Sequence, residues 1–147
     1  MILLDSNVYI RSFNDETFGT EFRAFHQAAL PQLALSAVVL TELLVGANSP
    51  AREKVLRRTI VEPFQARKRI HVPTRQTWEL SAEVDRRIRA LGSFAASLAQ
   101  RGFFNDILIA ASARELGGVV VTQNVADFTL IQRVLDFQFR TPWPSLP

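Results

Sequence analysis

Cysteine is absent from this chain of 147 residues, and histidine occurs only twice. The first absence excludes disulfide frameworks, thiol nucleophiles and cysteine-ligated zinc, and it favours a cytoplasmic protein. The two histidines, His26 and His71, have no partner at the spacing of metal ligands, so we expect ordinary structural roles for both. The sequence therefore argues against a site built on sulfur or imidazole ligands.

Long hydrophobic runs are also missing, although 48% of the residues are hydrophobic. No run approaches the roughly 18 to 20 apolar residues of a membrane span. The opening MILLDSNVYI lacks the basic start and longer apolar stretch of a signal peptide, so we expect a soluble protein without membrane contact. A chain of this length can bury one good core, and we predict a single domain over residues 1–147.

The formal charge of +3 is modest, but the basic residues are unevenly placed. One stretch holds Arg52, Lys54, Arg57, Arg58, Arg67, Lys68 and Arg69. Such clusters suit a polyanionic partner. The alternative is a solvated helix face, because Glu53 and Glu62 are interspersed among the basic residues. Charge alone does not decide between these two interpretations.

Short apolar segments alternate with helical patterns along the chain. We predict strands at 2–4, 33–35, 70–72, 119–121 and 137–139, with Ser36 and Thr74 as helix caps. Helices are predicted at 8–13, from about 22 to 30, and at 38–45, 50–66, 74–91 and 103–116, with a short one from Asp127. In the helix 74–91, the expected buried positions are Trp78, Leu80, Val84 and Ile88. This alternation predicts an α/β sandwich with a short-stranded, mostly parallel central sheet covered on both faces.

Four acidic residues interrupt these apolar segments. Asp5 follows the first strand directly, and Asp127 follows the fourth by a short turn. Both therefore belong at the carboxyl edge of the sheet, where parallel α/β sheets bind ligands. Glu42, in the second turn of its helix, can lean toward that edge. Asp106 begins the helix that leads into the fourth strand, and from this pattern we expect it at the opposite end of the sheet unless the helix is offset.

Each acid taken alone has an ordinary interpretation: Asp5 and Asp127 as helix caps, Asp106 as a complement to the helix dipole, and Glu42 as a solvent-facing residue. If the four converge, charges about 4 Å apart repel by about 4 kcal/mol per pair at an effective dielectric of about 20. A divalent cation resolves that repulsion, and an all-oxygen site suits Mg²⁺ or Mn²⁺. Such an ion polarises a phosphodiester and activates water, so the predicted chemistry is phosphodiester hydrolysis.

Four motifs around these acids resemble the PIN-domain family, and specifically its VapC-type toxins. They are LLDSNVYI at the start, LTELLVG around Glu42, FFNDILIAASA around Asp106 and VVVTQNVADF around Asp127. Their order and spacing cover almost the whole chain. The resemblance implies a PIN-like three-layer α/β/α sandwich in which the start of the helix at Asp106 does reach the pocket.

By this resemblance, Asp5, Glu42, Asp106 and Asp127 form the family's acidic quartet. Asp5 and Asp106 would be direct ligands of Mg²⁺ or Mn²⁺, and the other two would act directly or through water. Thr122 and Asn124 match polar positions that orient the carboxylates or the attacking water. Ser6 stands where many relatives carry threonine, and it retains the hydroxyl.

The resemblance also implies a function: an endoribonuclease, the toxin of a bacterial toxin–antitoxin pair. A small antitoxin would lie across its groove, and the toxin would form a homodimer. Arg52, Lys54, Arg57 and Arg58 are our candidates for contact with the RNA backbone. The alternatives are a housekeeping RNA-processing nuclease and a non-catalytic PIN-like module that binds RNA or protein. An aspartate-nucleophile phosphatase would carry a second aspartate two residues after the first, where this chain has Asn7.

Overall fold

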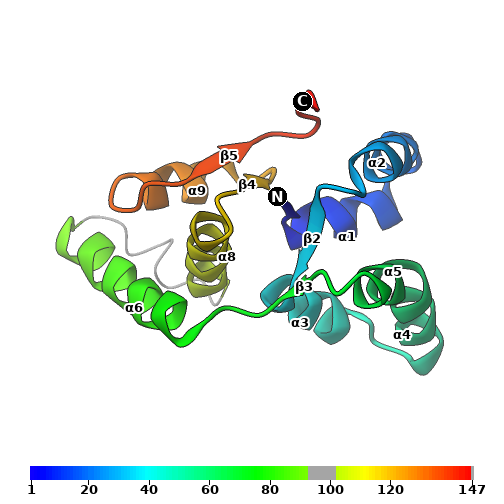
Figure 1. Cartoon of the computed structure of the whole chain (residues 1–147), viewed down its shortest axis with the longest axis horizontal. Helices are drawn as coiled ribbons and strands as arrows, with labels where there is room; N and C mark the ends of the chain where they lie inside the picture. Colours follow the sequence, from blue (N-terminus) through cyan, green and yellow to red (C-terminus); the bar gives the residue numbers. More distant parts are fainter. Residues whose placement is uncertain (93–101, 147) are drawn as a thin grey trace.

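The fold is known from a computed structural model, which describes residues 1–92 and 102–146. Its centre is a parallel five-stranded sheet with the strand order β3-β2-β1-β4-β5 (Figure 1). The strands are β1 (Ile2–Leu4), β2 (Leu33–Ser36), β3 (Ile70–His71), β4 (Val119–Val121) and β5 (Gln138–Arg140). β1 and β2 are buried along their whole length, as expected of nearly continuous apolar strands in a covered parallel sheet. The predicted parallel sheet is confirmed.

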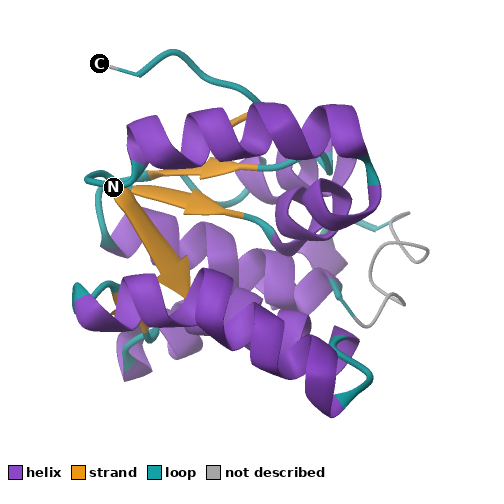
Figure 2. Ribbon diagram, turned by 90° about the vertical axis from the view of Figure 1, so that its right-hand side faces the viewer, coloured by secondary structure: helices purple, strands orange, loops and turns teal. Residues whose placement is uncertain are grey.

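Helices cover both faces of this sheet, as Figure 2 shows most clearly. They are α1 (Ser6–Asn14), α2 (Glu16–Ala29), α3 (Ala37–Gly46), α4 (Pro50–Leu56), the π-helical η1 (Arg57–Val61), α5 (Glu62–Ala66), α6 (Arg75–Ala90), α8 (Phe103–Glu115) and α9 (Val125–Gln132). The predicted three-layer α/β/α sandwich is therefore confirmed. Among the described residues, no helix combines the length and apolar character needed to cross a membrane.

Side-chain caps fix where several of these helices begin. The hydroxyl of Ser36 accepts a hydrogen bond from the backbone N–H of Val38 at 3.2 Å, and that of Thr74 accepts one from Thr77 at 3.3 Å. Both caps were predicted, and both satisfy N–H groups that the first helical turn leaves without a partner. Because each cap directly follows a strand or its connecting turn, it also fixes the direction in which the helix leaves the sheet.

The basic helix predicted over 50–66 is divided by a π-helical turn. The N–H of Glu62 donates to the carbonyl of Arg57, five residues earlier, instead of four. Pro63 explains the change, because proline has no N–H to donate and its ring clashes with the preceding turn of an α-helix. The turn places Arg57 and Arg58 at its start, where both side chains are exposed.

The buried face of α6 differs from the prediction. Trp78 was expected in the core, yet it is 48% exposed, and Leu80 is only half-buried. The buried stripe runs through Thr77, Ser81, Val84 and Ile88. The Ser81 hydroxyl donates to the Thr77 carbonyl at 2.7 Å, so a polar side chain can lie in the core without an unsatisfied group. A prediction from hydrophobicity alone misplaced this stripe, because its first two positions are the small polar residues Thr77 and Ser81.

The largest boundary difference is at α2, which begins at Glu16 and not near residue 22 as predicted. The Asp15 side chain caps this earlier start by accepting a hydrogen bond from the N–H of Phe18 at 3.0 Å.

The ends of several other elements differ from the prediction by one or two residues. β3 ends at His71 instead of residue 72, because Val72 already turns into solvent. β5 occupies Gln138–Arg140 instead of 137–139, in register with β4. The last helix begins at Val125, not at Asp127, because the Asn124 side chain caps it. Asp127 therefore lies in the first turn of α9.

Gly118 lies against the backbone of Met1 at the amino end of the sheet. A Cβ atom there would be 2.4 Å from the carbonyl oxygen of Met1. The same carbonyl accepts a hydrogen bond from the N–H of Val119 at 3.0 Å, which begins the pairing of β1 with β4. Only glycine allows the backbone to approach this closely.

Candidate active site

Asp5 lies at the carboxyl end of β1 and is 2% exposed. Its Oδ1 accepts a hydrogen bond from the backbone N–H of Ser6 at 2.7 Å, so Asp5 does cap α1. Its Oδ2 accepts from Asn7 Nδ2 and from Thr122 Oγ1, each at 2.7 Å. The same carboxylate therefore caps α1 through Oδ1 and joins the buried polar cluster through Oδ2. Ser6 contributes chiefly through its backbone N–H, and its hydroxyl makes a longer contact of 3.5 Å with the same Oδ1.

The turn after β4 carries the two polar residues that were predicted to orient carboxylates. Thr122 is fully buried, and its hydroxyl also accepts from the N–H of Asn124 at 3.0 Å. Asn124 Nδ2 donates to Oδ2 of Asp106 at 3.1 Å and to Oδ2 of Asp127 at 2.9 Å. One amide therefore bridges two acids, and one hydroxyl links this turn to Asp5.

Asp106 lies at the same edge of the sheet as the other acids, so our expectation from the strand pattern was wrong. A helix that leads into a parallel strand runs antiparallel to that strand and begins at the carboxyl edge. α8 accordingly starts beside the turn after β4, where Asn124 reaches Asp106. The expectation drawn from the family resemblance, that this helix start reaches the pocket, is confirmed by that contact.

Glu42 approaches the cluster from α3. Its Oε1 accepts a hydrogen bond from Asn105 Nδ2 at 2.9 Å. Its Oε2 is buried and has no hydrogen-bond partner within the described part of the chain. Asn105, like Asn7, was not among the predicted site residues. Each asparagine adjoins a predicted acid in the sequence, one position before Asp106 or two after Asp5, and that proximity was the available signal.

The other three acids all affect the pKa of Asp106. Burial raises the pKa of Asp106, and repulsion from Asp5, Asp127 and Glu42 raises it further, to about 8. The hydrogen bond from Asn124 opposes this rise only in part. A carboxylate with such a pKa holds its proton at neutral pH while no cation is present. Strongly perturbed acids of this kind concentrate at functional sites.

Asp5 has a raised pKa as well. The largest cause is burial, and repulsion from Glu42 adds to it. Hydrogen bonds from the Thr122 hydroxyl and from Ser6 act in the opposite direction, because they stabilise the charged form. Because the repulsion between Asp5 and Asp106 is mutual, Asp5 is opposed by Asp106 as well as by Glu42.

The donor set of this cluster fits a hard divalent cation. It offers only carboxylate, amide and hydroxyl oxygens, it contains mutually repelling acids, and one buried Glu42 oxygen has no hydrogen-bond partner among the described residues. Within residues 1–92 and 102–146, however, no three acidic or histidine side chains are grouped closely enough to coordinate an ion as they stand. The side-chain amides of Asn7, Asn105 and Asn124 donate to oxygens of these carboxylates.

The predicted RNA-contacting residues lie on α4 and η1. Arg52, Lys54, Arg57 and Arg58 are all exposed, and a shallow cavity of about 530 Å³ is lined by Lys54, Arg57 and Arg58 together with Pro50, Glu53 and Glu62. Arg57 pairs with Glu53 at 2.9 Å. Among the described residues, no hydrogen bond or ion pair joins this basic surface to the acidic cluster.

Several solved structures with a similar fold are toxin–antitoxin complexes. A chain of a FitAB complex bound to the IR36 DNA fragment matches with a TM-score of 0.71 and 22% identity, over 100% of this chain and 99% of that one. VapBC2 from Rickettsia felis, bound to a DNA fragment from its promoter, gives 0.65 and 19% over 98% and 100%. DNA-bound VapBC from Salmonella typhimurium gives 0.60 and 27% over 95% and 96%. No curated protein sequence matches the chain.

The sequence profile of the PIN domain matches residues 2–131. This range contains all four acids and the polar residues that contact them. It also spans four of the five strands of the sheet. The chain therefore belongs to the PIN-domain family, whose members are nucleases.

Proposed function

We propose that the protein is a Mg²⁺- or Mn²⁺-dependent endoribonuclease that hydrolyses RNA phosphodiester bonds. The observation that carries this proposal is the group of four acids at the carboxyl edge of the sheet, where burial, together with repulsion from the other three acids, raises the pKa of Asp106 to about 8. Four acids without a counter-ion destabilise the folded protein, so their presence together points to a function that requires them. Binding a divalent cation is such a function, because the cation neutralises the repulsion between the carboxylates.

Asp5 and Asp106 would hold the ion directly, with Glu42 and Asp127 binding it directly or through water. The ion would supply Lewis-acid activation of the phosphodiester and a more acidic bound water. The protein's own part is positioning: Thr122 and Asn7 fix the Asp5 carboxylate, and hydrogen bonds of 2.7 Å hold both contacts. Such supporting contacts keep ligands in the geometry that an ion requires.

Asn124 and Asn105 would act in the same way on the remaining acids. Asn124 donates to both Asp106 and Asp127, so it sets the distance between two carboxylates from neighbouring helices. Asn105 orients Glu42 and leaves its second oxygen free of hydrogen bonds with the described residues. Substrate phosphate oxygens would then be drawn to the ion and not repelled by bare carboxylates.

We further propose that the protein acts in the cytoplasm as the toxin of a bacterial toxin–antitoxin pair, as a homodimer silenced by a small antitoxin. Support comes from the solved relatives, which are FitAB and VapBC complexes. A gene for a small DNA-binding protein directly beside this one would favour the toxin role over a housekeeping RNA-processing role. Growth arrest on expression, relieved by that protein, would test the same point in cells.

Cleavage of a total-RNA pool by the purified protein tests the nuclease proposal. We expect defined fragments with Mg²⁺ or Mn²⁺ and none with EDTA, because the acids need a cation to approach a phosphate. Sequencing the fragment ends identifies the target. A folded protein that leaves every RNA intact in both metals would instead be a binding module.

The basic surface of α4 and η1 gives a separate prediction. Reversing Arg57 and Arg58 to glutamate should weaken RNA binding across sequences. It should also make the negative slope of log affinity against log salt shallower by about 1.4, because each phosphate contact to single-stranded RNA contributes about −0.7. Fluorescence anisotropy at several salt concentrations measures both. The matched control reverses Arg86 and Arg87, another exposed pair on α6. Equal slopes for the two variants would identify the α4 surface as an ordinary solvated face.

A further inference from the structure

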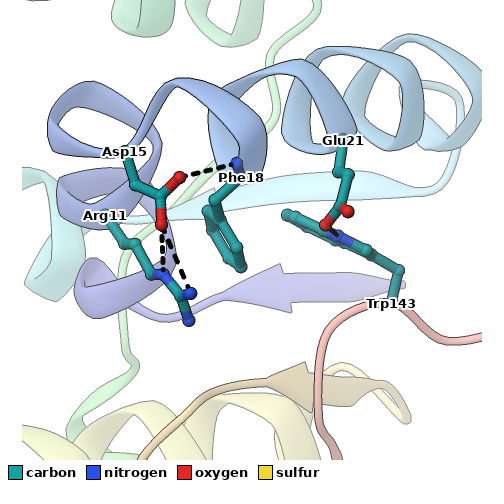
Figure 3. Close-up of polar contacts among 5 residues, drawn as sticks. All are labelled: Arg11, Asp15, Phe18, Glu21 and Trp143. Atoms are coloured by element: carbon teal, nitrogen blue, oxygen red, sulfur yellow. Dashed lines mark hydrogen bonds and ion pairs between the residues drawn. The ribbon is translucent and has the colours of Figure 1, made fainter.

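A second cavity, of about 350 Å³, lies between α1, α2 and the segment that follows β5. We call it the Arg11–Trp143 cleft, and its lining includes Arg11, Phe18, Glu21, Gln123, Thr141 and Trp143. Figure 3 shows Phe18 between the guanidinium of Arg11 and the ring of Trp143. The volume lies in the range of small-ligand sites, roughly 300 to 1,000 Å³.

Arg11 is held in place on one face and along one edge. Its guanidinium carbon lies 4.4 Å from the centroid of the Phe18 ring. Its Nε and Nη2 both donate to Oδ2 of Asp15 at 3.3 Å, and Oδ1 of Asp15 accepts from the Phe18 N–H at 3.0 Å. The side chain is nevertheless 48% exposed. A planar cation fixed in this way presents a ready stacking surface, since little side-chain freedom remains to be lost.

The opposite wall of the cleft is aromatic and acidic. Trp143 packs against Phe18 with ring centroids 4.9 Å apart, and its Nε1 donates to Oε2 of Glu21 at 3.0 Å. A carboxylate on this wall repels phosphate but accepts hydrogen bonds from the amino groups of nucleobases. The chemistry of the cleft therefore suits a base and not the phosphate that carries it. Single-stranded RNA is recognised through such contacts, by stacking on aromatic or guanidinium planes and by hydrogen bonds to base edges.

The cleft adjoins the acidic cluster. Arg11 follows Asn7 by four residues in α1, so both lie on one helix face, and Asn7 donates to Asp5. Gln123 lies between Thr122 and Asn124, and its N–H donates to Oδ1 of Asn7 at 3.2 Å. A base held here would belong to a nucleotide close to a phosphodiester at the acids.

We propose that the Arg11–Trp143 cleft is a base-binding subsite for single-stranded RNA. The base of a nucleotide near the scissile bond stacks on the free face of Arg11, and Gln123, Thr141 and Glu21 contact its edge. The subsite contributes to the choice of cleavage position. This inference rests on the proposed ribonuclease function, and it concerns residues that the acidic quartet does not include.

The test is binding of fluorescent RNA tetranucleotides of A, C, G or U to the purified protein in EDTA, where cleavage does not interfere. Arg11→Lys keeps the charge but removes the planar guanidinium, so we expect a loss of affinity of about 5- to 150-fold, the range of one lost base stack. Gln123→Ala should change the order of preference among the four bases. Arg23→Lys, an exposed arginine of α2 outside the cleft, is the matched control and should bind as the wild type does.

Several results would overturn the proposal. Wild-type affinity in Arg11→Lys, with an unchanged base order in Gln123→Ala, would show that no base lies in the cleft. A loss of affinity for the antitoxin with RNA binding intact would assign the cleft to a protein partner. The subsite and the nuclease are tested separately: tetranucleotide binding that depends on Arg11, without cleavage in Mg²⁺ or Mn²⁺, would support the subsite and refute the nuclease.

Discussion

Asp5→Asn should reduce RNA cleavage by about a thousandfold or more, which corresponds to ~4 kcal/mol of transition-state stabilisation. Asp5 is 2% exposed and is hydrogen-bonded to Ser6, Asn7 and Thr122. None of these three side chains is acidic, so none of them can supply a carboxylate in its place. An asparagine presents one oxygen and one NH₂ group to donors that now meet two oxygens. We therefore expect a weaker metal site and a loss of fold stability of about 1 to 3 kcal/mol, because two donors face each other.

The measurement is single-turnover cleavage of a mapped RNA in saturating Mg²⁺, with thermal unfolding in parallel. Asp136→Asn changes an exposed aspartate outside the cluster and serves as the matched control. Asp5→Asn samples are compared only under conditions where the variant is folded. Wild-type cleavage by a folded Asp5→Asn protein would remove Asp5 from the metal site.

Asp106→Asn should make the metal-free protein more stable at and above neutral pH. The pKa of Asp106 is raised from 3.8 to about 8 in the folded protein, mainly by burial and then by the other acids. Between these two values the folded state keeps a proton that the unfolded state has lost. Stability of the wild type therefore falls as pH rises through this window, by up to about 1.4 kcal/mol per pH unit from this one group. Asparagine cannot ionise, so the variant avoids this loss.

We expect Asp106→Asn to exceed the wild type by about 2 kcal/mol or more at pH 8, equivalent to ~4 to 8 °C in Tm. As the pH falls toward the unfolded pKa of 3.8 the advantage should shrink, and below about pH 3 it should disappear, because Asp106 is then protonated in both states. Urea unfolding in EDTA from about pH 3 to about pH 9 gives the two curves. Parallel curves would mean that Asp106 ionises as an ordinary surface aspartate and that the acids do not repel one another. Added Mg²⁺ should raise the Tm of the wild type more than that of the variant.

The fold could be predicted from the sequence because its strands are short, apolar and separated by helical patterns. The segments at 2–4 and 119–121 are completely apolar and could only be buried strands, and the caps at Ser36 and Thr74 follow from side-chain chemistry within a few residues. Trp78 shows the limit. Its size and hydrophobicity favoured a place in the core, yet the side chain is 48% exposed and contacts Phe104 of α8. A contact with a helix so far along the chain cannot be read from the sequence around Trp78.

The acidic residues could be singled out as polar interruptions of apolar segments, but their positions were harder to predict. The strand pattern placed Asp106 at the wrong edge because it did not take into account that α8 runs antiparallel to β4, the strand that follows it. Asn7 and Asn105 were missed because an asparagine near a helix start is usual for local reasons. Their contacts reach Thr122 and Glu42, which lie 115 and 63 residues away along the chain. Only the folded arrangement shows that these amides hold carboxylates.

The position of Met1 beside Gly118 indicates which end of the chain is better suited to an affinity tag. Met1 is at the amino edge of the sheet, whereas Asp5 is at the carboxyl edge, so an affinity tag on the amino end would emerge on the side away from the acids. The other end passes Trp143 on the wall of the Arg11–Trp143 cleft. A tag placed there would extend a segment that lies against the candidate RNA subsite. Amino-terminal tagging with a flexible spacer is therefore the better design for every binding experiment described above.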